Sequence, residues 1–361
     1  MNERTKALHD VGQSIWLDNI TRTMLDDGTL RRYIDELSVT GLTSNPTIFD
    51  KAIGGGDAYD EAIVQAAPKV DSNEELFFSL AIDDLGRAAD EFKAVHERTD
   101  GVDGFVSLEV SPLLADDAHA TIEQARDLHG RAGHDNLFIK IPGTEAGRTA
   151  IEETIAAGTP VNVTLLFDAA QYIGAAEAYM RGIERRVADG LDPAVSSVAS
   201  LFVSRWDVAV ADEIPDELRN TLGIAVAADG YRAYRELLDS DRWQRLANEG
   251  ARPQRFLFAS TGTKDPNASD VLYVEALAAP DSINTMPDAT LNAFADHGEA
   301  GEPIPADGGE AAKSLPQFSD AGIDLAALAA RLQREGAAAF DKSWHDMLDT
   351  IESKSRALAS A

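Results

Sequence analysis

The sequence contains no cysteine among its 361 residues. Disulfide bonds, thiolate nucleophiles and cysteine-ligated metals are therefore excluded. It also lacks any run of about 18 apolar residues, the length that a membrane-spanning helix requires. No apolar segment follows the opening residues Met1–Lys6, so we expect no secretory signal and a cytoplasmic location.

Basic residues are scarce. The chain has 32 lysines and arginines against 62 aspartates and glutamates, which gives a net charge of −30. Nucleic acid binds to basic surfaces, so we do not expect it as a partner. An acidic shell keeps a protein soluble and self-repelling. An anionic substrate would therefore need a locally basic pocket inside a negatively charged molecule.

Metal and nucleotide motifs are also missing. His129 and His134 are five residues apart, which does not place them on one helix face, and no glutamate accompanies them at ligand spacing. Neither a G-x-x-x-x-G-K-[ST] nor a G-x-G-x-x-G loop occurs. Gly54–Gly56 is a bare glycine run of the kind found in flexible loops, whereas Gly262–Lys264 is a better phosphate candidate. We expect no metal and no organic cofactor.

What the sequence does contain is an alternation of β-rich segments with helical stretches. Several of the β-rich segments are almost continuously apolar, as parallel strands covered on both faces are. We predict eight strands, at Ser14–Asp18, Gly41–Asn45, Gly104–Val110, Leu137–Ile141, Pro160–Phe167, Ser196–Val203, Arg255–Thr261 and Ser282–Met286. This α/β pattern favours a closed (β/α)8 TIM-type barrel. A doubly wound open sheet stays possible, because long inserts at 46–103 and 206–254 make the spacing uneven.

Helical periodicity is clearest from Phe77 to Val95, where apolar residues form one stripe. Ser72 and Glu75 precede it at capping-box spacing. Residues 270–278 also have a helical pattern, although Val271–Val274 alone would fit a strand.

The C-terminal part completes what we predict to be a single domain over 1–361. The stretch 297–317 is rich in glycine, glutamate and proline, and we predict a loop there. Residues 323–360 are predicted to form one or two extra helices, with Phe340 among their apolar contacts. These helices would either cover the barrel mouth or form an interface.

Lys140 is the most informative single residue. It lies within the apolar segment Asn136–Ile141, where burying an ammonium is costly. Burial favours the neutral, nucleophilic form of a lysine, which can attack a sugar carbonyl and form a Schiff base. The alternative is a strand-end lysine whose long stem reaches solvent.

Polar residues at the carboxyl ends of barrel strands line the active site. The predicted strand ends supply Asp18, Thr43, Ser44, Asn45, Glu109, Lys140, Asn162, Thr164, Ser200, Arg205 and Ser260. Taken singly, several have plainer explanations: Asp18, Ser44 and Asn45 as caps or turn formers, Thr164 as a β-branched strand residue, and Arg205 as a surface arginine. Taken together, they provide a lysine nucleophile, carboxylates that move protons, and hydroxyls with an arginine for phosphate.

These stretches resemble the transaldolase family. The resemblance rests on five motifs in matching order and spacing, Gly41–Phe49, Val106–Val110, Phe138–Pro142, Val161–Phe167 and Ala259–Pro266, and it covers roughly residues 10–300. It implies a circularly permuted class I aldolase barrel. It also implies transfer of a dihydroxyacetone unit from sedoheptulose 7-phosphate to glyceraldehyde 3-phosphate, giving erythrose 4-phosphate and fructose 6-phosphate.

Two other functions stay open beside this one. The first is a related lysine aldolase that releases free dihydroxyacetone. The second is a non-catalytic barrel that binds sugar phosphates, although a binder would gain by replacing an uncompensated buried lysine. Relatives include dimers, so we expect a monomer or a homodimer.

The resemblance also implies roles for individual residues. Lys140 would be the Schiff-base lysine, Asp18 the general acid and base of the carbon–carbon step, and Glu109 would act with Thr164 through a water molecule. Other members of the set would bind substrate: Asn45 and Asn162 would hold the dihydroxyacetone hydroxyls, with Thr43 supporting the site.

Ser200, Phe202 and Arg205 fit a family S-x-F-x-x-R pattern, in which the serine and arginine help to bind substrate and phosphate. Many relatives have proline and glycine inside this pattern, where this chain has Leu201 and Ser204.

The motif of the seventh strand departs further from the family. Many relatives carry an arginine two places after its alanine–serine pair, and this chain has Gly262 there. We therefore predict that Ser260 and Lys264 provide the phosphate contacts at this strand.

Overall fold

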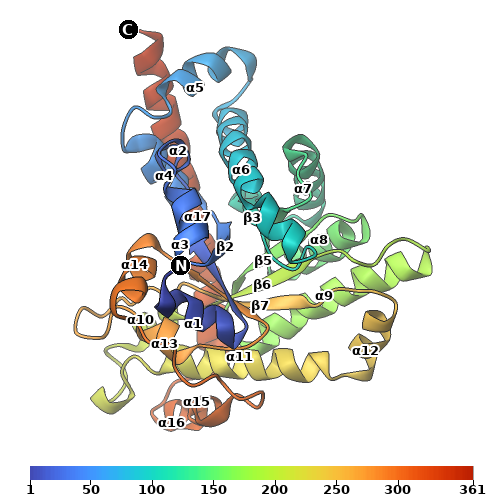
Figure 1. Ribbon diagram of the computed structural model, residues 1–361, viewed down its shortest axis with the longest axis vertical. Helices are drawn as coiled ribbons and strands as arrows, with labels where there is room; N and C mark the ends of the chain where they lie inside the picture. The colour runs from blue at the N-terminus through green and yellow to red at the C-terminus, as the bar shows by residue number, and fades with distance from the viewer. Residues whose placement is uncertain (361) are drawn as a thin grey trace.

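The computed structural model describes residues 1–360 and contains one eight-stranded sheet (Figure 1). Its strands are β1 (Gln13–Asp18), β2 (Val39–Thr43), β3 (Val106–Glu109), β4 (Leu137–Pro142), β5 (Val161–Leu166), β6 (Ser197–Phe202), β7 (Gln254–Ala259) and β8 (Ser282–Met286). Their order is β2-β1-β8-β7-β6-β5-β4-β3, and every recorded pair is parallel. All eight predicted strands are confirmed, with ends that shift by a few residues.

The two outer strands of this order, β2 and β3, meet and close the barrel. The Gly104 amide donates to the Thr40 carbonyl at 2.8 Å, and the Leu42 amide donates to the Phe105 carbonyl at 2.9 Å. Closure leaves the sheet without an exposed edge. The doubly wound open sheet is therefore wrong, and the (β/α)8 barrel is the fold.

Helices surround the barrel and fill both long inserts. They are α1 (Glu3–Val11), α2 (Arg22–Asp26), α3 (Thr29–Glu36), α4 (Pro46–Gly54), α5 (Asp60–Ala66), α6 (Asn73–Arg98), α7 (Ala118–Ala132), α8 (Glu145–Ala156), α9 (Ala169–Ala188), α10 (Ser204–Val210), α11 (Leu222–Leu238), α12 (Asp241–Asn248), α13 (Leu272–Ala276), α14 (Asp288–His297), α15 (Gly309–Lys313), α16 (Leu315–Asp320) and α17 (Leu325–Ala359), with 3-10 turns at Ala67–Lys69, Pro112–Leu114 and Asp216–Leu218. The predicted cap of α6 is confirmed, because the Ser72 hydroxyl accepts from the Glu75 amide at 3.1 Å. Helix α13 shows that the strand alternative for 271–274 is wrong. No helix within residues 1–360 is long and apolar enough to cross a membrane.

The loop predicted at 297–317 needs correction, because it contains α15 and the start of α16. Both helices pack on α11 (Figure 1). Residues 298–308 contain no helix or strand, but two of the residues that suggested a loop lie at helix starts: Gly308 precedes α15 with φ +78°, and Pro316 occupies the first turn of α16. A proline in the first turn is compatible with a helix, since its missing N–H needs no partner there. Phe318, which is fully buried, anchors α16.

The region predicted as one or two helices, 323–360, contains one helix, α17, which is 35 residues long. It packs against α4, α5, α6 and β5, so it crosses the end of the barrel where the strands finish. Its Trp344 is 1% exposed and lies 5.1 Å from the ring of Phe77 and 5.6 Å from that of Phe78, measured between centroids. The C-terminal helix therefore covers the barrel mouth.

The opposite end of the barrel is closed by a polar network around the buried Asp103. Its carboxylate accepts hydrogen bonds from Trp16 Nε1 at 2.7 Å, from Thr40 Oγ1 at 2.8 Å and from the Ser14 hydroxyl. Arg255 lies 3.7 Å from the same carboxylate. Polar groups at the amino end of barrel strands contribute to stability, whereas chemistry occurs at the other end.

Candidate active site

A cavity of about 410 Å³ opens at the carboxyl ends of the strands. The predicted site residues that line it are Asp18, Thr43, Asn45, Lys140, Thr164, Ser200, Phe202, Arg205, Ser260 and Lys264. Three of the predicted strand-end residues, Ser44, Glu109 and Asn162, do not line the cavity. Glu109 and Asn162 are buried in the strands on either side of Lys140, at the same register. Ser44 is buried after the end of β2, where its hydroxyl donates to the Ser107 carbonyl at 2.8 Å.

Lys140 is buried, with only 5% of its surface exposed. Its Nζ donates to Glu109 Oε2 at 3.0 Å and to the Ser44 carbonyl at 3.1 Å. These acceptors compensate the cost of burying an ammonium in the barrel. The alternative in which this lysine reaches solvent by its stem is therefore wrong.

The two carboxylate oxygens of Glu109 differ in their contacts, since only Oε2 accepts a hydrogen bond from a residue within 1–360. Burial raises the pKa of Glu109, and the neighbouring Lys140 opposes that rise. Within residues 1–360, neither Glu109 Oε1 nor the buried hydroxyl of Thr164 has a hydrogen-bond partner. Each of these two buried oxygens therefore keeps hydrogen-bonding capacity that a ligand or a water molecule can use.

Asp18 lies at the end of β1 and accepts a hydrogen bond from Thr43, which in turn contacts Thr285. Thr43 Oγ1 donates to Asp18 Oδ1 at 2.8 Å and lies 2.8 Å from Thr285 Oγ1. Burial raises the pKa of Asp18, while the nearby Lys140 and the Thr43 hydrogen bond oppose the rise. A carboxyl group whose pKa lies above its usual range is suited to accept and return protons.

The two asparagines occupy different positions. Asn162 is fully buried; its Nδ2 donates to Ser107 Oγ at 3.0 Å and its Oδ1 accepts from Ser200 Oγ at 2.8 Å. Asn45 caps α4, because its Oδ1 accepts from the Ile48 amide at 3.1 Å. The cap uses only the oxygen, so the Asn45 amide nitrogen keeps its donors for a ligand in the cavity.

Arg205 provides a cation in the first turn of α10. Its guanidinium carbon lies 5.2 Å from the ring centroid of Phe202 and 5.9 Å from that of Phe340. Burial lowers the pKa of Arg205. Among residues 1–360, no carboxylate lies within ion-pair distance of it.

Ser260 and Lys264 lie on the segment that follows β7. The Ser260 backbone is left-handed, with φ +56°, and its hydroxyl lies 2.9 Å from that of Ser204. A non-glycine residue in that region is uncommon and marks a place where the surrounding structure imposes the conformation. A Cβ on Gly262 would lie 3.6 Å from Lys264 Nζ, so the ammonium is close to this turn.

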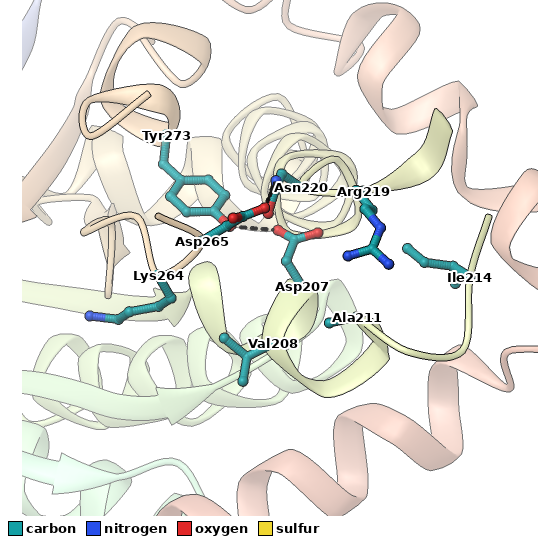
Figure 2. Close-up of a pocket in the computed structure, with 9 residues that line it drawn as sticks. All are labelled: Asp207, Val208, Ala211, Ile214, Arg219, Asn220, Lys264, Asp265 and Tyr273. Carbon is teal, nitrogen blue, oxygen red and sulfur yellow. Dashed lines mark hydrogen bonds between the residues drawn. The ribbon is translucent and has the colours of Figure 1, made fainter. Parts of the chain in front are cut away.

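A second cavity, of about 250 Å³, shares Lys264 with the first (Figure 2). Its carboxylates are already engaged: Asp207 accepts from the Tyr273 hydroxyl at 2.8 Å and caps α11 through two amides, and Asp265 accepts from Asn220 at 2.8 Å. Figure 2 shows the Lys264 ammonium pointing away from these groups. The lysine head therefore belongs with the larger cavity.

The larger cavity also contains residues that the sequence did not identify as functional. They are Thr47, Ile48 and Lys51 on α4, Ala259 at the end of β7, Thr285 on β8, Pro287, and Phe340 on α17. Gly262, from the segment Gly262–Lys264 that was predicted as a phosphate candidate, lines the cavity as well. Lys51 follows the Gly41–Phe49 motif, but it lies on a helix, and site residues were predicted only at or just after the ends of strands. The phenylalanine was predicted as an apolar contact only, because a helical stripe does not show which of its members reaches a distant site.

The charges that line the cavity suit an anion. Lys51, Lys140, Arg205 and Lys264 face it, and the only carboxylate among the lining residues is Asp18. This local excess of cations stands in a chain whose net charge is −30. Within residues 1–360, no three histidine, aspartate or glutamate side chains gather as a metal site. The arrangement can bind an anionic substrate and present an amine and a carboxyl group to it.

Comparison with known proteins gives one consistent result. The sequence profile of the family described as Transaldolase/Fructose-6-phosphate aldolase matches residues 15–351. A transaldolase of Saccharopolyspora erythraea is 43% identical over 357 residues, which cover 97% of each chain. A transaldolase of Parafrankia sp. is 41% identical with full coverage of both chains, and transaldolase 2 of Nostoc sp. is 38% identical over 98% of this chain and 97% of its own.

Proposed function

Because this chain belongs to the transaldolase/fructose-6-phosphate aldolase family, we propose that it transfers a dihydroxyacetone unit through a Schiff base on Lys140. The chain is an enzyme of the transaldolase class, a transferase. The proposed donor is sedoheptulose 7-phosphate and the proposed acceptor is glyceraldehyde 3-phosphate. The products are erythrose 4-phosphate and fructose 6-phosphate.

The first step is attack of the Lys140 amine on the ketose carbonyl. The contact between Lys140 Nζ and Glu109 Oε2, at 3.0 Å, supports it, because a proton leaving the ammonium can pass to that carboxylate. The nitrogen then bonds to the carbonyl carbon and gives a carbinolamine. Loss of water from the carbinolamine gives the iminium.

A water molecule bound by Glu109 and Thr164 would carry protons in this step and in its reversal. The support is that Glu109 Oε1 and the Thr164 hydroxyl are both buried and have no hydrogen-bond partner among residues 1–360. Such a water would protonate the departing hydroxyl and later attack the iminium to release product.

Asp18 would break and remake the carbon–carbon bond. It takes the proton of the hydroxyl next to the cleaved bond, the aldehyde leaves, and the bonding electrons move to the iminium nitrogen to form an enamine. The enamine then adds to the acceptor aldehyde, and Asp18 returns the proton to the new hydroxyl. The raised pKa of Asp18, caused mainly by burial, suits both directions.

The remaining residues would bind substrate. We assign the dihydroxyacetone hydroxyls to Asn45, which lines the cavity, and to Asn162, which does not line it but lies opposite Lys140 and uses one of its two amide N–H groups on Ser107. Thr43 would support the site through its bond to Asp18. The phosphate would lie at the basic part of the cavity, against Arg205 with Ser200 and Phe202 nearby, and Ser260 and Lys264 from the segment after β7. Arginine presents the fixed donor geometry that a phosphate requires.

One observation carries the proposal: a lysine that is 5% exposed at the end of β4, in contact with a buried glutamate beside the cavity. Its test is chemical trapping. Incubation with fructose 6-phosphate and borohydride should add a reduced dihydroxyacetone mass to the peptide that contains Lys140. A Lys140→Met variant should remain unlabelled. Labelling at another lysine, or none in the wild type, would refute the Schiff-base assignment.

A lysine aldolase that releases free dihydroxyacetone is the second candidate, because the matched family includes fructose-6-phosphate aldolase in its description. The two functions differ in their need for an acceptor. We expect turnover of fructose 6-phosphate to depend on erythrose 4-phosphate. Rapid cleavage without an acceptor would favour the aldolase, and binding without either reaction would indicate the non-catalytic barrel.

Four broader expectations stay predictions. We propose a cytoplasmic location, and a monomer or homodimer with no nucleic-acid partner. Sedimentation velocity with and without DNA would test the oligomeric state and the absence of nucleic-acid binding. We also propose that the barrel is a circular permutation of the class I aldolase barrel. Superposing its strands on such a barrel would test the permutation.

A further inference from the structure

Helix α17 brings one aromatic ring into the cavity from the far end of the sequence. Phe340 is 6% exposed and lines the cavity beside two cations. Its ring centroid lies 5.6 Å from Lys140 Nζ and 5.9 Å from the guanidinium carbon of Arg205. The ring is therefore placed between the reacting end of the cavity and its basic end.

Arg205 is held in an unusual way for a half-buried arginine. No carboxylate within residues 1–360 lies in ion-pair range, whereas Arg242 makes ion pairs with two glutamates on α9. Two rings take the place of a carboxylate, Phe202 from the end of β6 and Phe340 from α17. A cation is attracted by the face of an aromatic ring, and more strongly when water is excluded.

We propose that Phe340 is a positioning residue that holds the Arg205 guanidinium ready for the substrate phosphate. This inference rests on the proposed function, which places the phosphate at Arg205. A carboxylate partner would occupy guanidinium N–H groups and repel the incoming anion. A ring contacts the guanidinium without accepting those N–H groups, so all five remain available for a phosphate.

Two contacts of α17 with the barrel place the Phe340 ring close to Arg205. Gln333 Nε2 donates to the Leu165 carbonyl at 2.9 Å, which fixes the helix at the end of β5. Gly336 lies one turn before Phe340, and a Cβ there would come within 3.0 Å of Leu165 Cδ2 and 3.2 Å of an Arg205 nitrogen. Because Gly336 has no side chain, the Arg205 guanidinium can lie against this turn of α17, and Phe340 on the next turn contacts it.

The test is equilibrium binding of glucitol 6-phosphate, measured by calorimetry. This alditol has no carbonyl, so its affinity reports phosphate binding without the lysine chemistry. Phe340→Leu keeps an apolar side chain of similar size but removes the ring, and we expect it to raise the dissociation constant about 3- to 30-fold. Phe340→Tyr keeps a ring and should restore affinity to within about two-fold of the wild type.

Two comparisons separate positioning from general destabilisation. Phe318→Leu removes a fully buried ring outside the cavity and should leave the dissociation constant unchanged. In an Arg205→Ala background, Phe340→Leu should cause no further loss. The inference would be overturned if Phe340→Leu bound glucitol 6-phosphate as tightly as the wild type does. It would also be overturned if Phe340→Leu lowered the affinity by the same factor when Arg205 is already replaced by alanine. Failure of the Schiff-base proposal would instead appear as absent borohydride labelling of the wild type, whatever the binding result.

Discussion

At the scale of single residues, the buried lysine is surrounded by groups that compensate its positive charge. Lys140 is compensated by the Glu109 carboxylate, by the Ser44 carbonyl and by the ring of Phe340. Removing one member of a buried ion pair leaves the other charge uncompensated, which is strongly destabilising. Variants of Glu109 will therefore lose stability together with activity, and Asp18 is the better residue for separating the two.

Asp18→Asn should gain stability at neutral pH while it loses activity. Burial raises the pKa of Asp18, so the folded protein holds this proton more tightly than the unfolded chain does. Wild-type stability therefore falls, relative to the asparagine variant, as pH rises through the folded-state pKa. The two proteins should be closest below about pH 4, near the ordinary pKa of an aspartate.

Urea unfolding between pH 4 and pH 8 would measure this difference. Asp35→Asn, at an exposed position of α3 outside the cavity, is the matched control and should follow the wild type. An Asp18→Asn variant that is less stable than the wild type at neutral pH would contradict the assignment. The loss of activity should appear in kcat, because the carboxyl acts on the reacting bond.

Arg205→Ala should impair the binding of phosphorylated sugars far more than it disturbs folding. A hydrogen bond to a charged group is worth about 1.5–3 kcal/mol, so KM should rise roughly 10- to 100-fold. Steady-state kinetics with fructose 6-phosphate and erythrose 4-phosphate provide the measurement. Arg219→Ala, which removes an arginine of the second cavity that is paired with Asp216, is the control and should leave KM near the wild-type value. An unchanged KM in Arg205→Ala would move the phosphate to Lys264 or another cation.

At the scale of elements, closure of the barrel depends on close contact between β1, β2 and the segment before β3. Gly41 lies at this contact: a Cβ there would come within 2.6 Å of Trp16 Cε2 and 2.8 Å of the Phe105 carbonyl oxygen. Part of that obstruction is backbone, which cannot move without breaking the hydrogen bonds that close the barrel.

Gly41→Ala should therefore destabilise the fold, by about 1–3 kcal/mol as overpacked core variants typically do. Thermal unfolding followed by circular dichroism would show a lower Tm. Gly54→Ala is the matched control, because a Cβ at that helical position meets only Thr350 Cγ2 at 3.4 Å. An alanine there should be neutral or slightly stabilising. Equal Tm values for the two variants would show that Gly41 is not needed for closure.

At the scale of the whole molecule, the net charge of −30 opposes compactness and association. Salt screens such repulsion, with a Debye length near 10 Å at 0.1 M. We expect Tm to rise between about 0.05 and 0.5 M KCl, and any self-association to strengthen over the same range. Calorimetry and sedimentation velocity would measure the two effects. A Tm that falls with KCl would show that ion pairs, and not repulsion, dominate the surface.

The sequence by itself determined the strands, the barrel class and most of the lining residues. Each of these depends on local information: apolar runs give strands, and polar residues at strand ends face the cavity in a barrel. The prediction of the capping box at the start of α6 also depended only on neighbouring residues. The loop at 297–317 was predicted wrongly only from Gly309 on, because glycine and proline mark helix starts as well as turns, and only packing on α11 shows which applies.

Only the tertiary structure decided how distant residues meet. It showed that Lys140 is buried against Glu109, that β2 and β3 close the sheet, and that α17 places Phe340 in the cavity. It also showed that Asn45 serves as a helix cap and lines the cavity at once. The physical reason is that burial and contact across some two hundred residues depend on how whole elements pack, and no pattern within a few residues records that packing.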